Sequence, residues 1–213
     1  MTRYKVIIEY DGKNFCGWQK QRSLISIQGT IEESLYKFCG KNISVFGAGR
    51  TDKGVHAKGQ VAHFDLEEGD LEDKNYKLGK LTMGLNFYLS RACNNEISII
   101  KTSKVDKEFH SRFSAKGRKY KYTILNKQTP SPLLKDKTWR VPLSLNILLM
   151  QKASTLLIGK HDFSAFRSID CQSKSPIKTI DSINIIKNNE LIDIYVEAKS
   201  FLMNQVRIIA GTL

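Results

Sequence analysis

A glycine-rich run over residues 46–64 holds the side chains best suited to chemistry. Its centre is the triplet Arg50-Thr51-Asp52. In an extended triplet, side chains two positions apart point to the same side, so the Arg50 guanidinium would keep the Asp52 carboxylate ionised. Attack on a sugar carbon or on a pyrimidine ring requires an ionised, oriented carboxylate. Asp52 is therefore a candidate nucleophile, with an ordinary turn aspartate in Thr-Asp-Lys-Gly as the alternative.

Two nucleotide-binding motifs can be excluded for this run. A P-loop ends in Gly-Lys-Ser/Thr, whereas here Lys53 precedes Gly54. A dinucleotide fingerprint needs a third glycine, and after Gly47 and Gly49 that position holds Asp52. The glycines instead allow a bulky ligand to approach the backbone closely.

The charge of the chain points to a polyanionic partner. The 213 residues include 34 Lys or Arg and 21 Asp or Glu, which gives a formal net charge of +13. Residues 101–140 hold twelve of these cations and three acids, and therefore most of the excess. A concentrated basic stretch is typical of nucleic-acid binding. A basic protein without such a partner is the alternative.

The sequence lacks the signals of membrane, secreted, disulfide-rich and metal-binding proteins. No apolar run approaches the ~20 residues that span a membrane, and charges occupy the start of the chain where a signal peptide is apolar, so we expect a cytoplasmic protein without membrane contact. The four cysteines have neither zinc-site nor dense disulfide spacing, and we expect reduced thiols. His56 and His63 have no acid or cysteine at ligand spacing, so we expect no metal.

The apolar pattern predicts strands and helices in alternation. The expected strands are 4–10, 43–46, 60–66, 97–105, 118–126, 178–187 and 191–199. The expected helices are 28–38, 74–88, 145–158 and a segment from 201. This order indicates an α+β fold with mainly antiparallel sheet. Because the second half loosely repeats the first, we expect two domains, 1–106 with the Asp52 loop and 107–213 with most of the basic charge.

Five blocks of sequence follow one another in a specific order. They begin at Tyr10 (YDGKNFCGWQKQ), Gly49 (GRTDKGVHAKGQVAHF), Phe109 (FHSRFSAKGRKYKY), Gly159 (GKHDFSAF) and Phe201 (FLMNQVR). Together they resemble the TruA family of tRNA pseudouridine synthases, over the whole chain. Chance would not align five ordered blocks, so the turn-only interpretation of the central aspartate loses its support.

The resemblance implies an isomerase that needs no cofactor and acts on tRNA. It implies two similar ferredoxin-like halves, each an antiparallel sheet with helices on one face, a catalytic cleft between the halves, and a homodimer. The implied reaction converts uridine to pseudouridine at positions 38 to 40 of the anticodon stem-loop. The alternatives are a non-catalytic RNA-binding protein on the same fold and a synthase with other RNA targets.

The resemblance also implies roles for single residues. Asp52 matches the catalytic aspartate, and Arg50 matches the arginine that assists base flipping and holds the RNA. Tyr120 matches the tyrosine that stacks on the target base, while Tyr122 is more simply explained by packing in the sheet. Arg207 matches a late arginine that closes a salt bridge onto the aspartate. Because it lies in an apolar segment, we expect a buried carboxylate partner, with a surface arginine as the alternative.

The basic residues around the tyrosines are interpreted as phosphate contacts. They are Lys116, Arg118, Lys119 and Lys121. Such contacts strengthen binding without reading sequence, and a solvated strand edge is the alternative for each. The family usually continues past Leu213, so we expect the last helix to be cut short here.

Overall fold

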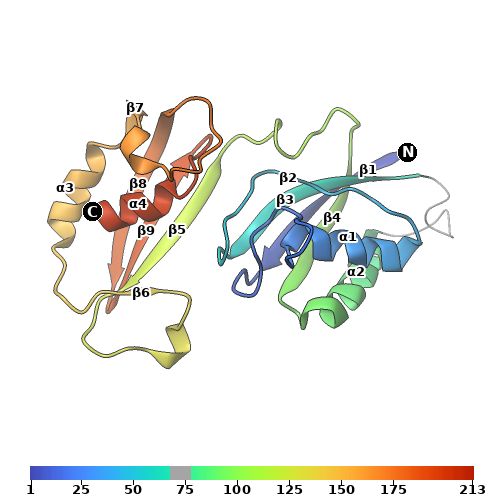
Figure 1. The fold of residues 1–213 in the computed structure, drawn as a ribbon, viewed down its shortest axis with the longest axis horizontal. Coiled ribbons are helices and arrows are strands. Elements are labelled where there is room, and N and C mark those ends of the chain that lie inside the picture. The colour runs from blue at the N-terminus through green and yellow to red at the C-terminus, as the bar shows by residue number, and fades with distance from the viewer. Residues whose placement is uncertain (68–77) are drawn as a thin grey trace. The chain divides into compact units, whose positions relative to one another are not determined.

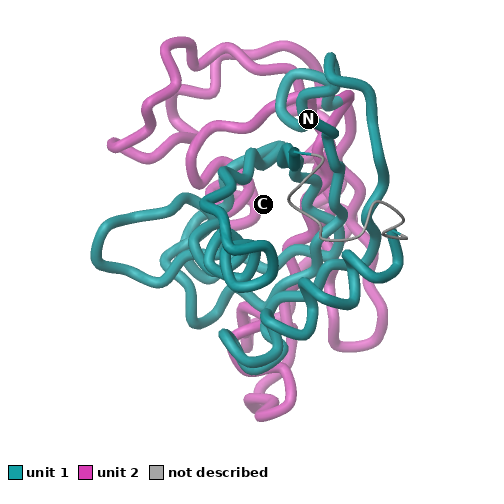
Figure 2. The backbone as a smooth tube through the Cα atoms, turned by 90° about the vertical axis from the view of Figure 1, so that its right-hand side faces the viewer, with its two compact units in different colours: residues 1–115 teal, residues 116–213 magenta. Residues whose placement is uncertain are grey.

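The computed structural model describes residues 1–67 and 78–213. These residues form two compact units, Met1–Ala115 (unit 1) and Lys116–Leu213 (unit 2), drawn in different colours in Figure 2. Unit 1 extends beyond residue 106, where we expected the division. The reason is a pair of hydrogen bonds from the Arg3 guanidinium in the first strand to the carbonyl oxygens of Lys107 and Phe109, at 2.6 and 2.8 Å.

Unit 1 is a four-stranded antiparallel sheet with two helices. Its strands are β1 (Thr2–Tyr10), β2 (Phe46–Gly47), β3 (Ala57–Leu66) and β4 (Ile97–Val105), in the order β2-β3-β1-β4. Its helices are α1 (Ile27–Cys39) and α2 (Leu78–Cys93). Both helices pack on the same side of the strands (Figure 1). The sequence βαββαβ is that of a ferredoxin-like half.

Local sequence explains these elements well. In β1, Tyr4, Val6 and Ile8 are buried at alternate positions against the helices. The Ser26 side chain accepts a hydrogen bond from the third backbone N–H after it and so caps α1. Gly40 ends the same helix at φ 71°, a conformation that glycine adopts without strain.

Unit 2 is a five-stranded sheet with two helices and its own core. The strands are β5 (Arg118–Leu125), β6 (Trp139–Arg140), β7 (Gly159–Asp162), β8 (Ile177–Asn188) and β9 (Leu191–Ala198), in the order β6-β5-β9-β8-β7. The helices are α3 (Ile147–Thr155) and α4 (Gln205–Thr212). All strand pairs are antiparallel except the two-residue pairing of β5 with β6. Both helices contribute to a single apolar core on one face of the sheet.

The expected α+β class is confirmed, whereas two elements differ from expectation. The strand expected at 43–46 is wrong, because β2 covers only Phe46–Gly47. Val45 instead donates its N–H to Glu32 and accepts from Gln28, so side chains of α1 take the backbone groups that a strand would pair. The helix expected from 201 begins only at Gln205, because Asn204 has a left-handed backbone at φ 60°.

Further features of the fold concern α2, two short strands, the cysteines and helix length. Of the helix expected at 74–88, residues 74–77 lie outside the described residues, and α2 continues to Cys93. The short strands β6 and β7 were not expected from the sequence. All four cysteines are free. In the described part of the chain, every helix is too short or too polar to cross a membrane.

Candidate active site

The loop that carries Asp52 runs from β2 to β3 and is anchored through Thr51. The Thr51 hydroxyl lies 2.7 Å from the hydroxyl of buried Tyr10, and its carbonyl accepts the Trp18 N–H at 3.0 Å. Thr51 therefore points into unit 1. Of its two neighbours, Arg50 is exposed, whereas Asp52 is half-buried like Thr51 itself. One inward residue thus presents two charged side chains outward.

Three glycines let neighbouring chain segments press against this loop. A Cβ on Gly17, whose φ is +116°, would lie 2.6 Å from the Thr51 carbonyl oxygen. A Cβ on Gly47 would lie 2.5 Å from the Trp18 ring, and one on Gly12 would overlap the Val55 carbonyl. Real Cβ atoms do not approach other atoms so closely. Only glycine fits at these positions, so the loop is held tightly.

A tight turn follows Asp52 and returns the chain to β3. The Val55 N–H donates to the Asp52 carbonyl at 3.1 Å, and Gly54 within the turn has φ +76°. The Gly12 N–H donates to Nδ1 of His56 at 3.1 Å. This histidine therefore serves the loop structurally.

The Arg50–Asp52 ion pair expected from the triplet is not formed among the described residues of unit 1. The segment that holds Arg50 and Asp52 between β2 and β3 has no regular secondary structure. It does not bring them into contact, because the Arg50 side chain extends into solvent. The guanidinium is therefore exposed to a ligand.

In unit 2, an aromatic group forms where β5 meets the segment before α4. The rings of Tyr120 and Phe201 meet edge to face, with centroids 5.1 Å apart. Tyr122 lies on the same face of β5, and its pKa is raised by burial while the nearby charge of Arg207 opposes the rise. The structure thus brings Tyr120, Tyr122 and Arg207 into one region of unit 2.

Arg207 lies in an apolar segment of sequence, yet its side chain on α4 is exposed. Buried residues of this segment include Leu202, Gln205 and Ile209, and Arg207 lies between them in sequence on another side of the helix. Within unit 2 its side chain is therefore exposed, and the expected carboxylate partner stays a prediction.

The basic residues of β5 lie away from the tyrosines. Lys119 pairs with Glu197 at 2.6 Å, and Lys121 approaches Asp193 at 3.4 Å, across the β5–β9 pair. Since side chains alternate along a strand, these lysines occupy the face opposite Tyr120. The Arg118 guanidinium donates to the Lys199 carbonyl. These three contacts separate the expected phosphate-binding set into strand residues with protein partners and Lys116, exposed at the start of unit 2.

The candidate residues therefore form two groups. Arg50 and Asp52 belong to unit 1, and Tyr120 and Arg207 belong to unit 2. Each group is ordered by its own unit.

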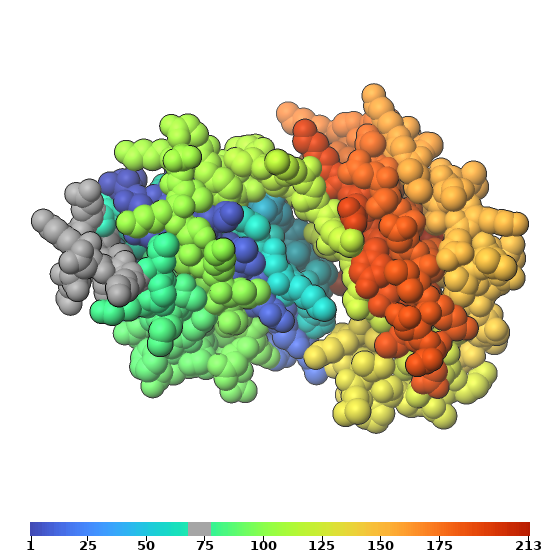
Figure 3. Space-filling model, turned by 180° about the vertical axis from the view of Figure 1, so that it is seen from behind, coloured from blue at the N-terminus to red at the C-terminus, as the bar shows by residue number. Residues whose placement is uncertain are grey.

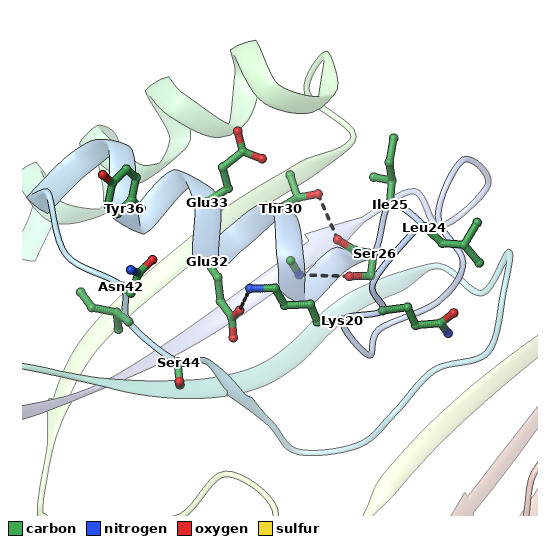
Figure 4. Close-up of a pocket in the computed structure, with 13 residues that line it drawn as sticks. Lys20, Leu24, Ile25, Ser26, Thr30, Glu32, Glu33, Tyr36, Asn42 and Ser44 are labelled. Atoms are coloured by element: carbon green, nitrogen blue, oxygen red, sulfur yellow. Dashed lines mark hydrogen bonds and ion pairs between the residues drawn. The ribbon is translucent and has the colours of Figure 1, made fainter.

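A hollow of about 560 Å³ lies beside the first turns of α1 (Figure 4). Polar side chains drawn there have structural partners: Lys20 pairs with Glu32 at 2.8 Å, and Ser26 caps the helix. None of the candidate residues lines this hollow. The hollow is therefore not an alternative to the Asp52 loop as a candidate catalytic site.

Histidines and acids do not gather into a metal centre. Within residues 1–67 and 78–213, no three His, Cys, Asp or Glu side chains are placed to hold a metal ion. His63 is buried instead in contact with Ser111, whose N–H donates to Nδ1 at 3.2 Å. Burial lowers the pKa of His63, and the nearby charges of Arg3 and His110 lower it further.

Sequence reasoning assigned no role to the residues that hold the loop. Tyr10, Trp18 and the close-approach glycines act through backbone and side-chain contacts between segments far apart in sequence. The available signal was the block that begins at Tyr10, which contains two of these glycines and the tryptophan. Its spacing did not say which loop it would touch.

Comparisons with known proteins agree on one family. A family model described as tRNA pseudouridine synthase matches residues 6–114 and 153–213. The chain is 47% identical over 212 residues to tRNA pseudouridine synthase A of Anaplasma phagocytophilum (strain HZ), covering 99% of this chain and 82% of that protein. The protein of the same name from Wolbachia pipientis wMel is also 47% identical, with 83% of it covered. That from Ehrlichia ruminantium (strain Gardel) is 46% identical, with 82% covered.

Proposed function

This chain belongs to the tRNA pseudouridine synthase family, and we propose that Asp52 is the residue on which its catalysis depends. Its reaction is the isomerisation of uridine to pseudouridine in tRNA. The observation that supports Asp52 is the anchored loop: Thr51 is held from inside by Tyr10 and Trp18, and the neighbouring carboxylate lies half-buried at the surface. A carboxylate on a braced loop is positioned before substrate arrives, which lowers the cost of orienting it.

The chemistry asks for a group of this kind. The bond between N1 of uracil and C1′ of ribose breaks, the base rotates, and C5 bonds to C1′ while the hydrogen of C5 is lost and N1 gains a proton. The overall change is an isomerisation, so no external oxidant or reductant is needed. A carboxylate could attack C1′, add to C6 or remove a ribose proton. All three routes require Asp52 at the target nucleoside.

The other candidates are assigned binding roles within the same proposal. Arg50 contacts the RNA near the flipped nucleotide, which its exposed guanidinium supports. Tyr120 stacks on the target base, and Arg207 contributes to substrate binding beside it. The grouping of these two residues with Phe201 and Tyr122 supports a single aromatic and cationic surface on unit 2. Stacking one base contributes ~1–3 kcal/mol, comparable to the cost of flipping it out.

The proposed function includes the target uridines, the oligomeric state and the cellular location of the protein. We place the target uridines at positions 38 to 40 of the anticodon stem-loop, and the protein in the cytoplasm as a homodimer. The family supports these assignments, and the exposed leucines on and beside α3, Leu148, Leu149 and Leu156, supply apolar surface for association. Mapping pseudouridine on a transcript pool tests the target, since modification of another tRNA arm or of rRNA contradicts it. Sedimentation equilibrium tests the homodimer.

The test of Asp52 is tritium release from C5-labelled uridine in unmodified tRNA, because forming the C1′–C5 bond displaces that hydrogen. Asp52→Asn keeps the shape of the side chain and removes its charge. We expect turnover to fall by a factor on the order of 10³ or more, with tRNA affinity largely kept. The exposed Asp181→Asn on β8 is the matched control and should release tritium at the wild-type rate. Turnover retained in Asp52→Asn would refute the assignment.

The same assay separates the synthase from a non-catalytic binder. A binder would hold tRNA and release no tritium, in the wild-type chain as well as in the variant. Release by the wild-type chain alone assigns both the reaction and the residue.

A further inference from the structure

An exposed phenylalanine follows β4 in unit 1 without an assigned role. Phe113 is 80% exposed, more than any other aromatic side chain in the part of the chain that the structure describes. An apolar ring of this size in water forgoes the free energy that its burial would contribute. The segment that carries it, lime in Figure 3, lies on the outside of unit 1 in that view, beside atoms of β1 (blue) and β3 (cyan).

Phe113 is the outermost member of a column of rings. Its centroid lies 4.4 Å from that of His110, which lies 4.7 Å from His63, which in turn lies 5.1 Å from Phe46. The column therefore runs from the open ring of Phe113 past His63, which is 2% exposed, to Phe46, which is 49% exposed. His63 follows Ala62, which packs under the helices, so it stands on the other face of the sheet. The column rises from the face that α1 and α2 leave open.

The backbone that presents Phe113 is locked on both sides. The His110 N–H donates to the Ser114 hydroxyl at 3.0 Å, and the Ser114 N–H donates back to the His110 carbonyl at 2.8 Å. Ser111 donates from its hydroxyl to the Phe46 carbonyl at 2.6 Å. A ring held in this way loses little conformational entropy when a ligand covers it. Such preorganisation suits a recognition side chain.

The segment that carries the ring has more cations than acids: residues 104–116 hold Lys104, Lys107, Arg112 and Lys116 against Asp106 and Glu108. Arg112 and Lys107 are both exposed, and the Lys5 ammonium lies 5.8 Å from the ring centroid of Phe109. An exposed ring on a basic segment fits a nucleotide, which offers a flat base and a phosphate, better than it fits an apolar protein or lipid surface.

We propose that Phe113 is a stacking site for an unpaired base of the tRNA substrate, separate from the target base. The proposal rests on tRNA being the substrate of this chain. The base lies on the open side of the Phe113 ring, and His110 supports the ring from beneath. The exposed guanidinium of Arg112 lies next in sequence for the phosphate of the stacked nucleotide.

The test compares tRNA dissociation constants of Phe113 variants at several salt concentrations, using an unmodified tRNA transcript. Phe113→Leu keeps an apolar side chain and removes the π face, so we expect binding weaker by about 5- to 150-fold, which corresponds to roughly 1–3 kcal/mol. The slope of log Kd against log salt should stay unchanged, because no phosphate contact is removed. Phe113→Trp should restore or exceed wild-type affinity, since it offers a larger face.

Phe87→Leu is the matched control. Phe87 is a half-exposed phenylalanine of the same unit, on α2, where it packs against Arg91. It should bind tRNA within about twofold of wild type. All variants should unfold at the wild-type urea midpoint within error, because the substituted rings are exposed.

Three results would overturn the stacking site: Phe113→Leu binding within twofold of wild type, equal weakening in Phe113→Leu and Phe113→Trp, or a changed salt slope. A shift in the sedimentation coefficient of the tRNA-free protein in Phe113→Leu would assign the ring to a protein contact instead and would equally overturn it. A failure of the proposed function can be distinguished from a failure of the stacking site. If the wild-type chain releases no tritium from tRNA, the proposed function fails, whereas turnover by wild type together with unaltered binding by Phe113→Leu defeats the stacking site alone.

Discussion

At the scale of single residues, the loop proposed to carry catalysis is held by side chains outside the proposed chemistry. Thr51 points inward to the hydroxyl of Tyr10, and this orientation presents its charged neighbours outward. The loop can be held so closely because Gly17 and Gly47 have no Cβ. The position of the Asp52 carboxylate is therefore a property of residues in the preceding segment as much as of its own loop.

Gly17→Ala tests this dependence. The added Cβ meets the Thr51 carbonyl, which is backbone and cannot move aside cheaply, at a φ of +116° that alanine rarely adopts. We expect stability to fall by about 1–3 kcal/mol in urea unfolding. We expect the rate of tritium release to fall further than that of Gly79→Ala. Gly79 is helical and has open space around it, so its substitution should be neutral or slightly stabilising. Wild-type turnover in folded Gly17→Ala would show that the clamp does not position the loop.

At the scale of elements, polar groups of the sheet in unit 1 bind residues 107–111, which follow β4 and lie outside the sheet. Arg3 of β1 forms a two-pronged pair with Asp65 of β3, both at 2.8 Å, and also donates to the carbonyls of Lys107 and Phe109. Hydrogen bonds of this kind hold Asp65 ionised, and its pKa is lowered chiefly by the bond from Arg3. His63 completes the attachment, which is why unit 1 extends to Ala115.

The pH dependence of stability follows from His63. Its pKa in the folded protein lies below the unfolded value of about 6.5, mainly because of burial. Above a pH of about 6.5, the His63 imidazole is neutral in both the folded and the unfolded protein. Below it the unfolded chain binds the proton first, so the free energy of unfolding falls with falling pH, by at most about 1.4 kcal/mol per unit. Urea unfolding at pH 7.5 and 5.0 should show a smaller loss in His63→Gln than in wild type, whereas the exposed His161→Gln should lose as much as wild type. An unchanged loss in His63→Gln would contradict this account. Asp65 contributes only at lower pH, because its lowered pKa keeps it charged in this window.

At the scale of the whole molecule, charge governs the encounter with tRNA. The net charge of +13 is concentrated in residues 101–140. Part of that charge is paired across the β5–β9 strands, Lys119 with Glu197 and Lys121 with Asp193, on the face opposite Tyr120. Exposed pairs of this kind contribute little to stability. Their lysines can exchange a carboxylate for a phosphate when RNA binds.

We expect tRNA affinity to fall steeply with salt, by roughly 0.7–0.9 in log K per log salt for each phosphate neutralised. Lys116→Gln should reduce that slope by about one such step if this exposed lysine contacts a phosphate. Lys37→Gln on α1, where the lysine pairs with Glu33 one turn away, is the control and should leave the slope unchanged. Filter binding between low and moderate salt measures both. A flat dependence would remove residues 101–140 from the RNA-binding surface.

Local pattern alone determined much of this protein. Alternation in β1, the Ser26 cap and the Gly40 stop follow from interactions within a few residues, and such interactions can be read in order along the chain. The catalytic candidate Asp52 was also identified from sequence, through ordered blocks that specify a family and so a chemistry.

Tertiary structure decided what depends on contacts between distant segments. The strand expected at 43–46 was lost because side chains of α1 bind Val45, and the outward position of Asp52 depends on Tyr10, Trp18 and Gly17. Exposure was decided in the same way: the apolar ring of Phe113 is open, and Arg207 lies at the surface although it stands in an apolar run. Spacing predicts which side chains share a face, but only the packed chain determines what each face meets.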